Sequence, residues 1–205
     1  MFTFDRKSFF DHYRELFGPL TQTLVDALNT LLTKIESDAR WTGSDNDLRQ
    51  LAYALATFNW ETARTFLPIH EFGSTAYFNK RYGPQTKVGK TLGNTKAGDG
   101  ALFHGRGFVQ LTGRTNYGKA AKLTGVPLLT EPDRALEPDL AYDIAVQGMK
   151  DGWFTGKKLD NFIKDGSPPD YFNARKIING LDKADRIAQL ARQFEEILRF
   201  SRVTN

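Results

Sequence analysis

The chain has 205 residues, of which 40% are hydrophobic and 25% are charged, the composition of a soluble globular protein. A chain of this length buries a sizeable core without covalent staples, so it suits one domain or a compact pair of lobes. The sequence contains no cysteine, which excludes a disulfide framework, thiol catalysis and cysteine-ligated metal.

The formal net charge is +4, and a basic excess favours anionic partners. The basic residues are interspersed with acidic ones, so ordinary solubility charge explains the excess equally well. No basic stripe with interleaved aromatic residues supports nucleic-acid binding. We therefore expect no nucleic-acid partner.

The first residues lack the basic start, apolar stretch and cleavage site of a signal peptide. No apolar run reaches the ~18–20 residues that cross a bilayer. We therefore expect synthesis in the cytoplasm and no stable membrane insertion.

Helical periodicity dominates the first third of the chain. Apolar residues at helical spacing predict helices over 7–17 and 20–36, and Gly18 with Pro19 ends the first of them. The polar stretch from Thr42 to Asp47 predicts a loop that also caps the next helix, expected over 47–64.

The centre of the chain, from about residue 73 to residue 107, is rich in glycine and loses this periodicity, which predicts turns and short extended pieces. Prolines punctuate a loop further on. Further helices are expected over 116–123, 138–151, 157–164 and 171–200, the last broken near Asn179-Gly180. A long irregular centre in a compact domain is usually functional. We predict a mainly α fold in which residues 1–205 form a single catalytic domain of two lobes with a central substrate cleft.

The histidines are few and scattered. His12, His70 and His104 form no His-x-x-x-His pair, and no cysteine assists them. His70-Glu71 is not followed by the second histidine of a zinc protease motif. We therefore expect neither a catalytic metal nor another cofactor.

Two glutamates have the chemistry of a glycosidase pair. Such an enzyme needs one carboxylic acid that protonates the leaving oxygen and a second carboxylate that acts as nucleophile or base. Glu61 is expected near the end of an apolar helix, where an apolar setting would raise the pKa of a carboxyl. Glu71 follows ten residues later in a loop, after Pro68 has ended the helix. On residue type alone both are better explained as solvated surface residues, since most glutamates are exposed.

Four sequence motifs give these glutamates a context. The chain resembles the glycoside hydrolase family 19 chitinases, within the lysozyme superfamily, and in particular their phage and bacterial lysozyme-like branch, the endolysins. The similarity runs from about residue 48 to 195, and its most specific part is the string GRG-x-x-QLTG-x-x-NY. The matching segments are Trp60–Thr62, Phe103–Tyr117, Ile177–Gly180 and Ala184–Ile187.

The resemblance implies catalytic roles for three residues. Glu61 occupies the general-acid position of a His-Glu-Thr motif in which Trp60 replaces the histidine. Glu71 is the candidate base, and Asp99 is its nearby rival. Thr112 matches the hydroxyl that holds the attacking water; on local sequence it is also a candidate helix N-cap.

The resemblance also implies substrate-binding roles. Gln110, Asn116 and Tyr117 match residues that hold the sugar near the cut bond. Asn179 and Arg186 match groups across the cleft that bind substrate and support the carboxylates. Without the motif, Asn179-Gly180 would be a helix-ending turn and Arg186 a surface ion-pair residue.

Arg106 needs no catalytic role. It lies between two glycines, and we expect it to stabilise the loop by donating to backbone carbonyls.

The family implies an inverting, single-step hydrolysis, for which the two carboxyls stand ~6.5–9.5 Å apart. We expect a monomeric endolysin, released through a holin, that cuts the β-1,4 bond of peptidoglycan in the bacterial wall. A chitinase acting on N-acetylglucosamine polymers is the alternative, and a glycan-binding module without activity is a third reading.

Overall fold

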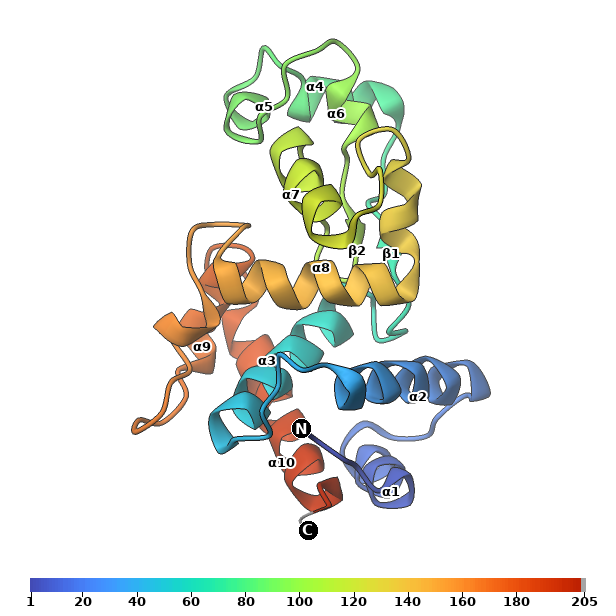
Figure 1. The fold of residues 1–205 in the computed structure, drawn as a ribbon, viewed down its shortest axis with the longest axis vertical. Helices are drawn as coiled ribbons and strands as arrows, with labels where there is room; N and C mark the ends of the chain where they lie inside the picture. The colour runs from blue at the N-terminus through green and yellow to red at the C-terminus, as the bar shows by residue number, and fades with distance from the viewer. Residues whose placement is uncertain (204–205) are drawn as a thin grey trace. The chain divides into compact units, whose positions relative to one another are not determined.

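The computed structural model describes residues 1–203, and it is built mainly from helices, as the sequence predicted (Figure 1). The chain divides into two compact units. Unit 1 comprises Met1–Phe66 together with the chain from Lys150 onwards, and unit 2 comprises Leu67–Met149. The candidate residues are distributed over both units, so each unit is described separately.

The first two helices of unit 1 lie where periodicity predicted them. They are α1 (Arg6–Phe17) and α2 (Gln22–Ser37). The α1 helix ends at Gly18, whose φ of 85° is a conformation that glycine adopts without steric cost. The side chain of Thr21 accepts from the backbone N–H of Leu24 and so caps α2.

The α3 helix (Asp45–Glu61) carries the candidate acid at its last position. The predicted cap is confirmed, because the Ser44 side chain accepts from the backbone N–H of Asp47. The predicted end at residue 64 is wrong, and so is the assignment of the stop to Pro68. Ala63 and Arg64 have φ values of 50° and 71°, which no α-helix contains, so the backbone turns away directly after Glu61.

The C-terminal part of unit 1 comprises η2 (Leu159–Asn161), α9 (Tyr171–Ala174), η3 (Arg175–Ile177) and α10 (Ala184–Ser201). The helix predicted over 157–164 is wrong, since only a three-residue 3₁₀ turn forms there. So short a segment gains too few hydrogen bonds to nucleate an α-helix. The predicted break near Asn179 is confirmed.

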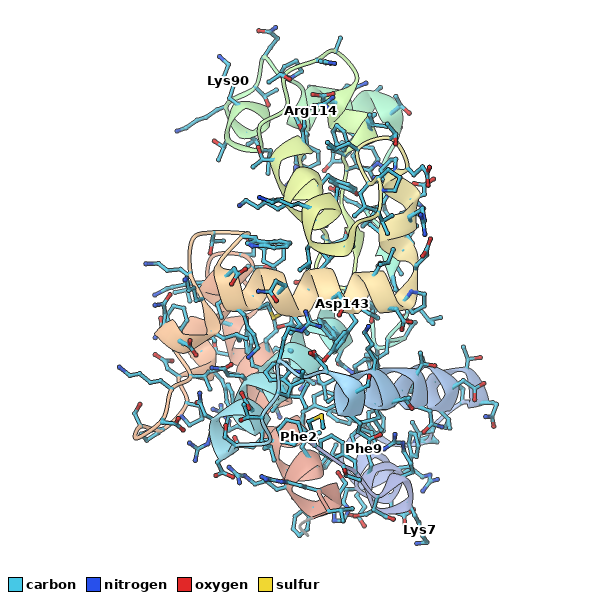
Figure 2. All side chains as sticks on the ribbon, viewed as in Figure 1. Phe2, Lys7, Phe9, Lys90, Arg114 and Asp143 are labelled. Atoms are coloured by element: carbon cyan, nitrogen blue, oxygen red, sulfur yellow. The ribbon has the colours of Figure 1, made fainter. Side chains whose placement is uncertain are left out.

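The core of unit 1 is made by α10 packing on α3 and α1 (Figure 1). Phe194 of α10 is fully buried, and its ring lies 5.1 Å from that of Phe17 and 5.9 Å from that of Phe66. Phe2 and Phe9, labelled in Figure 2, are also buried in this unit. Apolar burial of this kind is the main stabilising term of the fold, and it fixes the end of α3 from which the candidate acid projects.

Unit 2 is organised around a two-stranded antiparallel sheet. Strand β1 (Ile69–His70) pairs with β2 (Arg106–Gly107), with Ile69 opposite Gly107 and His70 opposite Arg106. The surrounding helices are α4 (Thr75–Tyr82), α5 (Lys87–Thr91), α6 (Asp99–Leu102), α7 (Arg114–Thr124), η1 (Pro132–Leu136) and α8 (Pro138–Asp151), whose last two residues belong to unit 1.

The sequence missed α4, α5 and α6, because the dense glycines mask their short apolar spacings. The α7 and α8 helices are confirmed, α8 at the predicted residues. Within residues 1–203, no helix is both long and apolar enough to cross a membrane.

Candidate active site residues

The candidate acid forms an ion pair. Glu61 Oε1 accepts a hydrogen bond of 2.7 Å from Arg175 Nη1. The Glu61 side chain is 18% exposed and that of Arg175 only 3%. The apolar setting predicted for Glu61 is therefore wrong, because its carboxylate faces a buried guanidinium.

Arg175 is held from its other side by the backbone. Its Nε donates to the carbonyl of Asp182 at 3.0 Å, and the hydroxyl of Tyr53 donates to the neighbouring carbonyl of Ala174 at 2.8 Å. Burial raises the pKa of Tyr53, so this hydroxyl keeps its proton. These contacts fix the guanidinium in place, which in turn orients the Glu61 carboxylate.

Sequence reasoning expected this guanidinium to come from Arg186, and the structure corrects that expectation. Arg186 Nη1 donates to Gln189 Oε1 at 2.7 Å on the exposed side of α10. Arg175 is 114 positions from Glu61 in the chain, and no local pattern marks it. Asn179 is exposed in the turn after η3.

In unit 2, both oxygens of the candidate base accept hydrogen bonds. Glu71 Oε1 accepts from the hydroxyl of Tyr82 at 2.8 Å, and Oε2 accepts from the backbone N–H of Gly105 at 3.2 Å. The backbone N–H of Glu71 in turn donates to the carbonyl of Gly105 at 2.8 Å, next to the β1–β2 pair. Burial, followed by the bond to Glu71, raises the pKa of Tyr82, so Tyr82 remains a donor.

Because Gly105 has no side chain, one side-chain oxygen of Gln110 and one of Glu71 can both lie close to its Cα atom. A methyl group in place of its hydrogen would lie 2.7 Å from Gln110 Oε1 and 3.1 Å from Glu71 Oε2, both tighter than ordinary contact. The structure therefore brings Gln110 and Glu71 together at Gly105. The sequence analysis did not predict this contact, although Gly105 belongs to the GRG string.

Thr112 and Asn116 form a short chain of bonds with Gln110. Thr112 Oγ1 donates to the Gln110 carbonyl at 2.7 Å, and Asn116 Nδ2 donates to the Thr112 carbonyl at 3.1 Å. The alternative reading of Thr112 as an N-cap is wrong, because Gly113 holds that position without a side-chain bond. Gln110 itself has a φ of 55°, an uncommon conformation for a residue with a side chain.

Tyr117 is placed differently from its predicted role. Its ring is fully buried, and its hydroxyl donates to the His104 carbonyl and accepts from Arg106 Nη1. A side chain with no exposed surface cannot contact a sugar, so Tyr117 supports the loop instead.

The predicted loop-stabilising role of Arg106 is confirmed, since its Nη1 donates to the backbone carbonyls of Leu102 and His104. Its Nε also donates to Asp133 Oδ1 at 2.8 Å. The loop that carries the QLTG string is thereby fixed from several sides.

Asp99, the rival candidate for the base, has a structural role. Its carboxylate accepts from Arg114 Nε at 2.8 Å and from the backbone N–H groups of Thr95 and Lys96 (Arg114 is labelled in Figure 2). The Arg114 bond is the chief reason that the pKa of Asp99 falls to about 2. So acidic a group is a poor base near neutral pH.

Two histidines lie beside the candidate base. His70 Nδ1 is 3.1 Å from His104 Nε2, and the His104 ring stacks on Phe78 with centroids 4.5 Å apart. Burial is the main cause that lowers the pKa of His104. Among residues 1–203, no three His, Cys, Asp or Glu side chains lie together as ligands for a metal ion.

Comparisons with known proteins agree with this fold. No family profile matches the chain. An endochitinase of Arabidopsis thaliana is 31% identical over 162 residues, which cover 75% of this chain and 47% of that protein. A second endochitinase of that plant is 37% identical over 68 residues, 33% of this chain and 22% of the relative. The chain thus spans less than half the length of the curated relatives it matches.

Solved structures give the same result over nearly the whole chain. Chitinase C from Streptomyces griseus superposes with a TM-score of 0.60 at 20% identity, covering 98% of this chain and 95% of the other. A bacterial family 19 chitinase gives a TM-score of 0.56 at 18% identity, covering 95% and 96%. The chain therefore has the fold of the family 19 chitinases. This is the fold that its motifs predicted.

Proposed function

We propose that this protein is a glycoside hydrolase that cuts β-1,4 bonds of an N-acetylated cell-wall glycan by inversion. Glu61 is the acid and Glu71 the base. The observation that carries the proposal is the buried guanidinium of Arg175 at Glu61, together with the neutral donors that hold Glu71. A guanidinium favours the ionised form of a carboxyl, so it stabilises Glu61 in the state that remains after this residue has given up its proton. Neutral donors orient the Glu71 carboxylate without a fixed positive charge beside it, which suits a proton acceptor.

The acid step uses Glu61 in its protonated form. As the bond between the sugar C1 and the glycosidic oxygen breaks, Glu61 gives its proton to that oxygen and is left as a carboxylate. The ion pair with Arg175 then stabilises the charge that the transfer creates. In this reading the pair seen in the structure corresponds to the state after proton transfer.

The base step uses Glu71. A water forms a bond to C1 from the opposite face and passes one proton to this carboxylate. The hydroxyl proton of Thr112 is engaged with the Gln110 carbonyl, so its oxygen is left to accept from that water. Gln110 Oε1, which converges with Glu71 on Gly105, offers a second acceptor for the water or for a sugar group.

For the substrate we propose peptidoglycan, at the bond between N-acetylmuramic acid and N-acetylglucosamine. The absence of cysteine and the net charge of +4 suit an endolysin that acts on an anionic wall. Release through a holin and action as a monomer belong to the same proposal. Chitin is the second candidate, favoured by the names of the endochitinase relatives.

The test compares the wild type with Glu61→Gln and Glu71→Gln on purified peptidoglycan and on chitin oligomers. Glu196→Gln is the matched control, because Glu196 is an exposed glutamate of α10. We expect clearing by the wild type and the control, and a loss of about 10²–10⁴-fold in each of the other two. Undiminished clearing by Glu61→Gln would refute Glu61 as the acid.

Mass spectrometry of the products tests the reaction class. New reducing ends with inverted configuration support the proposal. Anhydro ends would indicate a transglycosylase, and cleaved amide bonds an amidase. Binding of glycan by the wild type without any product would identify a module without activity.

A further inference from the structure

Unit 1 contains a surface cavity that none of the roles above explains. Its volume is about 700 Å³, within the usual range of ~300–1,000 Å³ for small-molecule sites. It lies where the ends of α1 and α3 meet the first half of α10. Its lining includes Asn59, Trp60 and Arg64 beside the end of α3, and Arg186 and Gln193 of α10.

This cavity is distinct from the surroundings of the candidate acid. Glu61 is not among its lining residues, and its carboxylate is engaged with Arg175. Leu16 and Phe17 precede the segment that carries the chitinase-like motifs. The resemblance assigned Arg186 to substrate binding, and the cavity joins Arg186 and Trp60 to residues outside the matching segments, such as Leu16 and Arg64.

The charge of the cavity is positive. Arg64 and Arg186 line it, and the lining residues include no aspartate or glutamate. Arg64 Nη2 donates to the Phe17 carbonyl and Arg186 Nη1 to Gln189, which uses one of the five donors on each guanidinium. The remaining donors suit a carboxylate, the group that arginine binds in fork geometry.

Two buried polar atoms on the lining residues lack a partner. Asn59 is 2% exposed, and its Nδ2 has no hydrogen bond. The same holds for the Oε1 atom of Gln193. Buried polar groups are almost always bonded, so each of these two atoms has an unused capacity for a hydrogen bond with a ligand or a water. Here a donor and an acceptor are both unused, which suits a ligand with amide or hydroxyl groups.

Trp60 adds an aromatic surface. It is half-buried and lines the cavity together with Phe17 and Leu190. An indole with its polar handle is suited to a ligand that has one apolar face and polar edges, as a pyranose ring has.

We propose that this cavity binds the muramyl unit of peptidoglycan, an N-acetylated sugar that carries a carboxylate. The carboxylate pairs with Arg64 and Arg186, and the sugar lies on Trp60. The amide of Asn59 and the carbonyl of Gln193 bond its polar groups. The inference rests on the proposed wall-glycan function, and it specifies why peptidoglycan would be preferred over chitin, whose sugars carry no carboxylate.

The experiment is a titration followed by ¹⁵N NMR, which reports the site directly through the side-chain amide of Asn59 and the indole of Trp60. Five probes separate the chemistry. N-acetylglucosamine lacks the carboxylate, and N-acetylmuramic acid carries it on the lactyl group. N-acetylmuramyl-L-alanyl-D-isoglutamine carries it on the peptide. The methyl ester of each acid removes the charge alone.

We expect one of the two acids to bind about tenfold more tightly than its ester and than N-acetylglucosamine, the loss typical of one charge-assisted hydrogen bond. Whichever acid shows this preference identifies the source of the carboxylate. In Gln193→Glu, which adds a negative charge at a half-buried position, the preference should vanish. In Arg64→Gln it should fall several-fold. Arg192→Gln, on α10 but outside the cavity, is the control and should retain it.

The proposal would be overturned if the acids and their esters bind with equal affinity. It would also be overturned if the NMR signals of Asn59 and Trp60 do not shift during the titration. Retention of the preference in Gln193→Glu would do the same. None of these readouts requires turnover, so a failure here is distinguishable from a failure of hydrolysis in the clearing assay.

Discussion

Removing Glu61 should destabilise the fold as well as abolish activity, because Arg175 depends on it. Arg175 is 3% exposed and has the Glu61 carboxylate as its ionic partner at 2.7 Å. Breaking a fully buried pair by deleting one partner costs ~3–5 kcal/mol. Since Glu61 is 18% exposed, water can partly replace it, and we expect a loss of about 2–3 kcal/mol in Glu61→Ala.

The variant Glu61→Gln separates the loss of stability from the loss of activity. Its amide oxygen still accepts from the guanidinium, so the loss should be about 1 kcal/mol. For a chain of this length 1 kcal/mol corresponds to about 2–4 °C in Tm. Thermal unfolding followed by circular dichroism should therefore place Glu61→Ala about 5–10 °C below the wild type and Glu61→Gln about 2–4 °C below it. If the two variants melt together, the dependence of Arg175 on a hydrogen-bond acceptor at position 61 is refuted.

Three further outcomes follow from unit 2. Gly105→Ala should reduce activity at least tenfold, because its methyl group would lie 3.1 Å from the carboxylate of the candidate base; Gly118→Ala, which meets nothing within 4 Å, should retain full activity in the same clearing assay. Tyr82→Phe removes one of the bonds that orient that carboxylate and should lower kcat about tenfold; an equal loss in the exposed control Tyr77→Phe would contradict this reasoning. Asp99→Asn removes a carboxylate whose pKa is lowered in the fold to about 2. The ionised Asp99 carboxylate contributes about 2 kcal/mol to the free energy of unfolding of the wild type. This contribution is complete above pH 4 and is lost as the pH falls toward 2. Urea unfolding should therefore show that the difference in free energy of unfolding between the wild type and Asp99→Asn becomes smaller as the pH falls over this range. A difference that does not change with pH would contradict the stabilising role of this carboxylate.

Local sequence features predicted most of the helices of unit 1. The spacing of apolar residues placed α1 and α2, and the Ser44 cap placed the start of α3, because these signals act within about four residues along the chain. The end of α3 was misplaced by three residues. Pro68 was the visible stop signal, whereas the actual stop is the left-handed backbone of Ala63 and Arg64, which residue type does not announce.

The sequence by itself determined the helical class of the fold, the identity of the two candidate carboxyls and the loop-stabilising role of Arg106. Only the tertiary structure decided what surrounds each carboxyl. Arg175 reaches Glu61 across 114 positions, and Gly105 reaches Glu71 across 34. The physical reason is that periodicity and capping are local, whereas an ion pair or a close glycine contact exists only after packing has brought distant segments together.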